Sequence, residues 1–167
     1  MSSSTHNAVA AIDIGTNSTN LLITDRDGQT LERQLTVTRL GQGVDKSRML
    51  APEAIERTIL CLARYRERLD AHGSPLLRII ASSASRDALN REEFFDQAEN
   101  VLGVRPELVS GEEEARLAYR GCTTNLIPDT NGHLIIDIGG GSTELIIGTT
   151  QLSQAYSIDA GAVRMTE

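Results

Sequence analysis

Two short segments of the chain carry the same arrangement of a carboxylate, a glycine-containing turn and hydroxyl side chains. The first is AIDIGTNSTNLLIT, residues 11–24, and the second is IIDIGGGSTELIIG, residues 135–148. In each segment an apolar run leads to an aspartate just before the turn, and Ser-Thr follows the turn. Aligned 124 positions apart, eight of the fourteen positions are identical: Ile12/Ile136, Asp13/Asp137, Ile14/Ile138, Gly15/Gly139, Ser18/Ser142, Thr19/Thr143, Leu21/Leu145 and Ile23/Ile147. The repeat predicts two related strand–turn–strand units that face one ligand.

The turns of these segments have the composition of a phosphate site. Glycine lets a ligand approach the backbone closely, and consecutive N–H groups in a turn bind anions. The residues concerned are Gly15, Asn17 and Ser18 in the first copy and Gly139, Gly140, Gly141 and Ser142 in the second. A hairpin also uses glycine for purely conformational reasons, and that alternative would be preferred for a single copy. The duplication favours a phosphate site.

The aspartates of the repeat predict a metal. Asp13 and Asp137 each follow an apolar run, and a buried carboxylate without a partner costs several kcal/mol. Mg²⁺ is the usual ion where carboxylates meet phosphate oxygens. The second copy has Glu144 where the first has Asn20, which adds a carboxylate beside the glycine turn. The alternative for Glu144 is an ordinary polar position on a strand.

A third group of carboxylates lies in the segment SGEEEAR, residues 110–116. Three glutamates at a helix start are stabilised by the helix dipole, so a solvated first turn is one interpretation. Glu113 also has a structural role, as the capping-box partner of Ser110. Glu114 has no such role and faces a different direction. The segment therefore offers Glu114 as the carboxylate without a structural role, and Glu113 as either a capping partner or a supporting catalytic acid.

Composition limits the function classes. The net charge of −7 argues against nucleic acid or a membrane surface as the partner. It also requires local positive groups if the substrate is a polyanion. The polar start, residues 1–7, lacks the apolar core of a signal peptide and is expected to be disordered. Cys61 and Cys122 have no metal-like spacing, so reduced thiols are expected. We predict a cytoplasmic protein.

The order of predicted elements is that of an α/β protein. Three strands, at 8–14, 19–24 and 29–38, are followed by helices and short strands in alternation up to about residue 120. The continuous apolar run of the first strand predicts burial on both faces. Pro128 and Asn131-Gly132 mark a boundary between lobes. We therefore predict a first lobe over 8–124 and the first strands of a second, incomplete lobe over 133–167.

Two arginines are placed to meet a phosphate. Arg86 follows the predicted strand 76–81, and ligands of open α/β sheets bind at the carboxyl ends of the strands. Arg39 precedes the glycine-rich loop ending at Gly43 and is the weaker candidate. A solvated arginine is the alternative for both.

These motifs together resemble one family. AIDIGTNS, the RLGQG loop at 39–43, ASSASR at 81–86, SGEEEAR and IDIGGGSTE, in this order and spacing, are similar to the exopolyphosphatase/guanosine pentaphosphate phosphohydrolase (Ppx/GppA) family. The similarity runs from about residue 8 to the last residue. It implies the fold of the sugar-kinase/heat-shock-protein-70/actin superfamily, in which two ribonuclease-H-like lobes hold phosphates between paired hairpins. It also implies that the rest of the second lobe is missing from this sequence.

The resemblance further implies roles for individual residues. It places the family's catalytic glutamate on Glu114 and magnesium-site positions on Asp137 and Glu144, with Asp13 near. The expected reaction is Mg²⁺-assisted hydrolysis of a terminal phosphoanhydride in inorganic polyphosphate or guanosine pentaphosphate.

Two other functions stay open at this point. One is an ATP-dependent kinase or ATPase of the same superfamily, and the other is a non-catalytic module that senses phosphate or nucleotide. A chain that carries only half of the phosphate-binding cleft is expected to be inactive alone. Its exposed strand edges would allow it to pair with a second copy.

Overall fold

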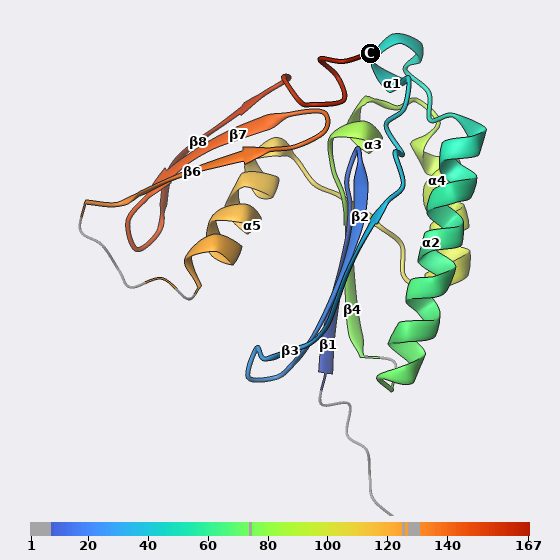
Figure 1. The fold of residues 1–167 in the computed structure, drawn as a ribbon, viewed down its shortest axis with the longest axis horizontal. Coiled ribbons are helices and arrows are strands. Elements are labelled where there is room, and N and C mark those ends of the chain that lie inside the picture. Colours follow the sequence, from blue (N-terminus) through green and yellow to red (C-terminus); the bar gives the residue numbers. More distant parts are fainter. Residues whose placement is uncertain (1–7, 74, 125, 127–130) are drawn as a thin grey trace, which may run out of the picture. The chain divides into compact units, whose positions relative to one another are not determined.

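The computed structural model describes residues 8–73, 75–124, 126 and 131–167 (Figure 1). The predicted disordered start at residues 1–7 and Pro128 of the predicted boundary lie outside these residues. The chain forms two compact units, Met1–Leu108 and Val109–Glu167. Each unit is built on its own β-sheet and is described by itself.

The first unit contains a five-stranded mixed sheet in the order β3-β2-β1-β4-β5. Its strands are β1 (Ala8–Ile14), β2 (Ser18–Asp25), β3 (Thr30–Val37), β4 (Leu76–Ala81) and β5 (Glu107–Leu108). The first three strands are antiparallel, whereas β4 runs parallel to β1 and β5 parallel to β4. The carboxyl ends of β1, β4 and β5 therefore meet at one edge of the sheet.

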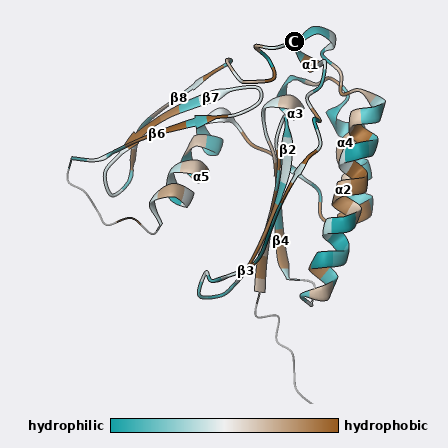
Figure 2. Cartoon of the chain, viewed as in Figure 1, coloured by the Kyte–Doolittle hydropathy of each residue, from teal (hydrophilic) through white to brown (hydrophobic). Residues whose placement is uncertain are grey.

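Helices cover one face of this sheet. The helices there are α2 (Pro52–Ala71) and α4 (Arg91–Leu102), while the short helices α1 (Val44–Ser47) and α3 (Ser83–Asp87) directly precede them along the chain. Pro52 begins α2 at its first position and Gly73, with φ +78°, follows its end, which are the positions that proline and glycine favour in helices. One side of α2 is apolar and the other is polar (Figure 2). Its buried residues, Ile55, Leu62 and Leu69 among them, join those of β1, β2 and α4 in one core.

Tyr65 ties α2 to the sheet. Its side chain is 1% exposed, and its hydroxyl donates to the Thr19 backbone oxygen (2.9 Å) and lies 3.0 Å from the Thr36 hydroxyl. Burial raises the pKa of Tyr65 to about 12. At the far end of α2, Arg68 and His72 both contact Glu32 of β3, and the hydrogen bond from Arg68 lowers the pKa of Glu32 to about 2.

One sequence prediction about this unit is wrong. The first strand is not buried on both faces, because Val9 is 40% exposed and Ala11 is also exposed, while the residues between them are buried. An apolar run alone does not distinguish the two cases when one face of a sheet is uncovered. Asn90 does not cap α4 with its side chain. Its amide instead exchanges two hydrogen bonds with the backbone of Leu50 (2.8 and 3.1 Å) and so holds a loop.

The second unit is a three-stranded antiparallel sheet in the order β6-β7-β8, with one helix against it. Its elements are α5 (Gly111–Thr123), β6 (His133–Ile138), β7 (Thr143–Gly148) and β8 (Leu152–Ile158). Ala115 and Tyr119 of α5 form a small core with Ile146 of β7. The Tyr119 hydroxyl donates to the Thr149 backbone oxygen (2.7 Å). The predicted hairpin and third strand of the second lobe are thus present.

The division into units differs from the predicted one. The sequence places the helix after β5 in the first lobe, with the boundary after residue 124, whereas the compact units meet between Leu108 and Val109. The reason is packing: α5 buries its apolar side on β7 and β8.

Candidate functional site

The first turn of the repeat is held from behind by the glycine-rich loop. The Gly15 N–H donates to the Ser18 oxygen (2.9 Å), which closes the turn between β1 and β2. The Thr16 oxygen accepts from the Gly41 N–H (2.9 Å), and the Asn17 oxygen accepts from the backbone N–H groups of residues 38 and 39. A Cβ at Gly41 would lie 2.3 Å from the Thr16 methyl carbon. The carbonyl groups of the turn are therefore occupied by the loop at 38–41.

Arg57 of α2 fixes the same loop. It donates to the backbone oxygens of Thr38 (3.1 Å) and Arg39 (3.4 Å) and to the Gln42 side chain (3.0 Å). Arg39 itself is exposed and has a left-handed backbone with φ 50°. The loop is thus built so that the Arg39 side chain stays at the surface.

Arg86 lies where the sequence predicts, after the carboxyl end of β4. It belongs to α3, whose first turn is joined to β1 by a backbone hydrogen bond from Ser82 to Ile14 (3.3 Å). Asp13, also at this edge, accepts a hydrogen bond from the side chain of Asn20 (3.3 Å). The first unit therefore gathers one turn, one carboxylate and two arginine-bearing segments at the carboxyl edge of its sheet.

The second turn repeats this construction in the second unit. The Gly139 N–H donates to the Ser142 oxygen at the same 2.9 Å. The loop that follows β8 then occupies the carbonyl groups of the turn. The Gly139 oxygen accepts from Ala162, the Gly140 oxygen accepts from Val163 (2.8 Å), and the Gly141 oxygen accepts from the Arg164 side chain (2.8 Å).

The two turns leave N–H groups free. The backbone N–H groups of Thr16, Asn17, Gly140 and Gly141 have no hydrogen-bond acceptor among the residues that the structure describes. Their carbonyl groups are turned towards the supporting loops. Successive unpaired N–H groups in a turn form an anion-binding concavity. Each turn can therefore donate to phosphate oxygens.

The carboxylates of the second hairpin lie opposite each other. Asp137 of β6 pairs in register with Glu144 of β7. Glu144 is only 1% exposed and accepts a hydrogen bond from the Ser157 hydroxyl of β8 (2.8 Å). Burial raises the pKa of Glu144, the hydrogen bonds from Ser157 and Ser142 oppose this, and the charges of Glu114 and Asp137 raise it further.

Helix α5 packs against the strands of the second hairpin and against β8. The charges of Glu114, on α5, and of Asp137, on β6, both raise the pKa of Glu144. A Cβ at Gly111 would lie 2.9 Å from the Ser157 Cβ, so the start of α5 packs directly on β8. This contact positions the glutamates of α5 beside the hairpin.

Glu113 and Glu114 are placed differently. The Glu113 N–H donates to the Ser110 hydroxyl (3.2 Å), which confirms the predicted helix start, and its carboxylate accepts from Arg116 (2.9 Å). Glu112 also pairs with Arg116 (3.3 Å). Glu113 is thus engaged in a surface ion pair, whereas the charge of Glu114 raises the pKa of Glu144 in the hairpin.

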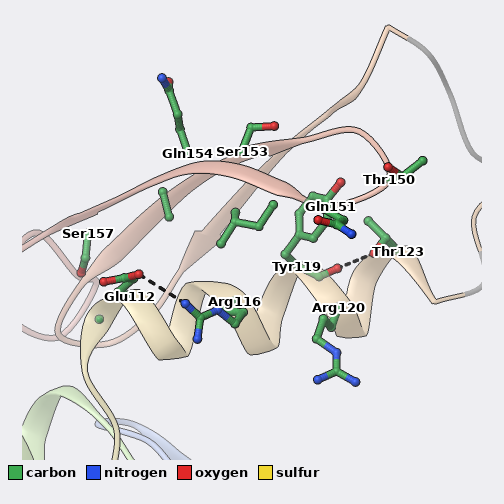
Figure 3. Close-up of a pocket in the computed structure, with 13 residues that line it drawn as sticks. Glu112, Arg116, Tyr119, Arg120, Thr123, Thr150, Gln151, Ser153, Gln154 and Ser157 are labelled. Carbon is green, nitrogen blue, oxygen red and sulfur yellow. Dashed lines mark hydrogen bonds and ion pairs between the residues drawn. The ribbon is translucent and has the colours of Figure 1, made fainter.

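A groove of about 740 Å³ lies in the second unit between α5 and β8 (Figure 3). Its polar lining residues include Arg116 and Arg120 from the helix and Ser153, Gln154 and Ser157 from the strand. Ser157 is shared between this groove and Glu144. The groove therefore borders the carboxylate group.

The fit of a metal depends on these carboxylates. The described residues contain no group of three or more His, Cys, Asp and Glu side chains arranged to hold a metal ion. The protein would thus offer Asp137 and Glu144 as a pair. Mg²⁺ is commonly held by one or two carboxylates together with waters and substrate phosphates, so the donor set fits this ion.

The structure brings the predicted residues together in two groups. Gly15, Asn17, Ser18, Arg39, Arg86 and Asp13 lie in the first unit, and Glu113, Glu114, Asp137, Glu144 and Gly139 to Ser142 lie in the second.

The sequence did not point to Arg57 or Ser157. Arg57 donates hydrogen bonds to the loop that carries Arg39, and Ser157 donates one to Glu144. A detectable signal exists for Ser157, because an apolar hairpin that buries a glutamate needs a donor on the neighbouring strand. No comparable signal exists for Arg57, which lies on the polar side of an amphipathic helix.

None of the described helices is long and apolar enough to cross a membrane.

Comparison with known proteins places the chain in a family. Residues 22–167 match the model of the Ppx/GppA phosphatase family. Exopolyphosphatase 2 of Mycobacterium tuberculosis is 42% identical over 171 aligned residues, which cover 95% of this chain and 54% of that protein. The chain thus spans about half the length of the curated relatives it matches.

Solved structures agree with this assignment. An exopolyphosphatase-like protein superposes with a TM-score of 0.88 at 45% identity, and the match covers 95% of this chain and 52% of the other. An exopolyphosphatase from Cytophaga hutchinsonii superposes with a TM-score of 0.90 at 31% identity and the same coverage. The predicted α/β fold, a ribonuclease-H-like lobe of the actin superfamily followed by part of a second, is confirmed. The chain belongs to the Ppx/GppA phosphatase family.

Proposed function

We propose that this chain provides the phosphate-binding turns and the catalytic carboxylates for hydrolysis of a terminal phosphoanhydride bond in inorganic polyphosphate. The observation that carries the proposal is the pair of turns with unpaired N–H groups, the second of which adjoins the cross-strand carboxylate pair Asp137 and Glu144. Phosphate oxygens need donors, and the in-line attack of water needs a base. The family and its exopolyphosphatase relatives support the same reaction class.

Glu114 is the proposed base. It accepts a proton from a water molecule whose oxygen attacks the terminal phosphorus, while the bond from that phosphorus to the bridging oxygen breaks. The products are orthophosphate and a chain that is one phosphate shorter. The backbone N–H groups of the turns stabilise the charge that develops on the phosphoryl oxygens.

Asp137 and Glu144 are the proposed ligands of Mg²⁺, with Asp13 as the corresponding carboxylate of the first hairpin. When bound, the ion neutralises negative charge on the phosphate oxygens. The Ser157 hydrogen bond keeps Glu144 fixed on the inner side of the hairpin. Arg86 and Arg39 are the proposed cationic contacts to the phosphate chain, which offset the net charge of −7.

Guanosine pentaphosphate ends in the same kind of anhydride, so the same groups would act on it. We assign polyphosphate as the substrate because the relatives at 42% and 31% identity are named exopolyphosphatases. An ATP-dependent kinase would share the phosphate turns but would transfer the phosphoryl group to a substrate other than water.

The test uses a chimaera, because the chain spans about half of its relatives. Joined to the half of the M. tuberculosis exopolyphosphatase 2 that it does not match, the chain should release orthophosphate from polyphosphate only when Mg²⁺ is present. Glu114→Gln should lower kcat by about 10²-fold or more, since it removes the base. Glu113→Gln is the matched control and should keep kcat within about threefold, because that carboxylate pairs with Arg116.

Retention of phosphate release by Glu114→Gln would refute the assigned base. Release from guanosine pentaphosphate alone would refute the assigned substrate. Phosphate transfer from ATP to an acceptor, without release from polyphosphate, would favour the kinase.

A further inference from the structure

Each unit places an arginine on the carbonyl side of its glycine-containing turn. In the second unit the Arg164 Nε donates to the Gly141 backbone oxygen (2.8 Å). That oxygen and the Ser142 N–H belong to one peptide unit, and in a trans peptide unit the C=O and N–H bonds point in opposite directions. The Ser142 N–H has no hydrogen-bond acceptor among the residues that the structure describes. Arg164 therefore holds the turn from the side opposite to its free donors.

Arg57 acts on the first turn through one intervening peptide unit. Its Nε donates to the Thr38 oxygen (3.1 Å), and the N–H of the same peptide unit, that of Arg39, donates to the Asn17 oxygen of the turn (2.9 Å). A second guanidinium nitrogen donates to the Gln42 side chain (3.0 Å), which fixes the direction of the Arg57 fork. The two units thus reach the same arrangement by different routes, with a loop residue in one and a helix residue in the other.

The charge of a guanidinium group matters at these positions. A hydrogen bond from a charged donor is roughly twice as strong as one between neutral groups, and it polarises the hydrogen-bonding groups linked to it. A cation on the carbonyl side therefore makes the N–H groups on the opposite side stronger donors. It also adds positive potential near the turns of a chain whose net charge is −7, without occupying the place of the ligand.

We infer that Arg164 and Arg57 are positioning residues of the two phosphate turns, which hold the turn carbonyl groups so that the N–H groups face a phosphate chain. The inference rests on the proposed function, since it takes the turns as the phosphate site. Unlike Arg39 and Arg86, neither arginine needs to touch the substrate. Arg164 bonds the turn itself, whereas Arg57 acts through the loop at 38–42, so the loss of Arg164 has the larger effect.

The first test follows the backbone amide signals of the isotope-labelled chain by NMR while sodium tripolyphosphate is added. A hydrogen bond to an anion moves an amide proton downfield, so the signals of Asn17, Gly140 and Gly141 should shift. Arg164→Ala should lower the shifts at Gly140 and Gly141 by at least about half, because a charge-assisted hydrogen bond is lost. The Asn17 shift should be kept in that variant and lost in Arg57→Ala, so each variant is a control for the other.

Matched controls remove the same charge elsewhere. Arg120 on α5 and Arg64 on α2 are exposed and make no hydrogen bond to either turn among the described residues. Arg120→Ala and Arg64→Ala should therefore leave the shifts unchanged. Arg164→Lys keeps a cationic donor for the Gly141 oxygen and should retain most of the shift. Arg57→Lys should not, because its acceptors need the guanidinium fork.

Backbone order in the free chain separates this inference from the proposed function. The order parameters of the Gly140 and Gly141 N–H bonds should fall in Arg164→Ala, from about 0.85 towards about 0.6. An unchanged tripolyphosphate shift in this variant would overturn the inference, as would an equal loss of the shift in Arg120→Ala. If the order parameters fall in Arg164→Ala while the unmodified chain shows no shift, Arg164 still holds the turn, and it is the proposed function that fails.

The chimaera with the M. tuberculosis half measures the consequence for catalysis. The KM for polyphosphate should rise at least about tenfold in Arg164→Ala and about threefold in Arg57→Ala, because misdirected donors bind the phosphate chain less well. A purely structural role would reduce the amount of folded enzyme, which lowers kcat per mole of protein and leaves KM unchanged. A lowered kcat with an unchanged KM in both variants would therefore overturn the inference.

Discussion

The two copies of the repeated hairpin bury opposite faces. In β1 and β2 the residues Ile12 and Leu21 are fully buried and Leu22 is 38% exposed, whereas in the second hairpin Ile136 is 55% exposed and Ile146, the counterpart of Leu22, is fully buried. The turns nevertheless close with the same hydrogen bond at the same length. Similar sequences therefore fix the turn and the register, while the helix that packs on the sheet determines which face is the core.

The same comparison separates the roles of the two carboxylate positions. In the first hairpin Asp13 faces the neutral amide of Asn20. In the second, Asp137 faces the buried carboxylate of Glu144, on the face covered by α5. The sheet face that holds these polar residues is thus uncovered by helices in the first unit and covered by α5 in the second. This difference gives the second hairpin its buried ionisable group.

The largest expected effects come from paired substitutions in the two hairpins. Ile12→Ala should lower the free energy of unfolding of its unit by about 4 kcal/mol, whereas Ile136→Ala should cost less than about 1 kcal/mol in this chain. The order should reverse for the other face, with Ile146→Ala costing about 3 kcal/mol and Leu22→Ala about 1 kcal/mol or less. Peptide-resolved hydrogen exchange in urea measures the free energy of unfolding of each unit separately. Equal costs for Ile12→Ala and Ile136→Ala would show that the burial difference is not real in solution.

The burial of opposite faces in the two hairpins is also a feature that the sequence does not predict. The hairpins, the α2 helix with its Pro52 start and Gly73 end, and the cap of α5 by Ser110 follow from local patterns, because neighbouring residues determine them. The location of α5 on the second sheet does not follow, since its amphipathic pattern fits any apolar face. For the site, residue types predict Asp137 and Glu144, but the pairing of Ser157 with Glu144 depends on strand register.

The supporting loops give the second comparison. A Cβ at Gly161 would lie 2.4 Å from the backbone carbon and oxygen of Gly140, whereas a Cβ at Gly41 would meet mainly the side-chain methyl of Thr16. Backbone has to shift in the first case, and a side chain in the second. Gly161→Ala should therefore cost about 3 kcal/mol in the second unit, and Gly41→Ala about 1 kcal/mol in the first.

Thermal and urea unfolding with hydrogen exchange of the turns measures both costs. Thr16→Ser removes the obstructing methyl group, so it should restore most of the loss caused by Gly41→Ala. If Gly161→Ala proved neutral, the loop after β8 would not be packed against the second turn.

The smallest expected effect concerns the buried carboxylate and depends on pH. Because the pKa of Glu144 is raised in the folded state, the folded protein binds its proton more tightly than the unfolded chain does. The free energy of unfolding of the second unit should therefore fall as pH rises from the ordinary glutamate pKa to the raised one, and should then level off.

Ser157→Ala removes the hydrogen bond to the ionised form, so it should cost about 1 to 2 kcal/mol at pH 8 and much less at pH 4. Glu144→Gln should remove the pH dependence and stabilise the unit at pH 8 by about 1 kcal/mol, while Ser153→Ala on the same strand is the neutral control. An equal cost of Ser157→Ala at both pH values would mean that the hydroxyl does not stabilise the ionised form of Glu144. The two hairpins would then not differ in their need for a hydrogen-bond donor at the position of Asn20 and Glu144.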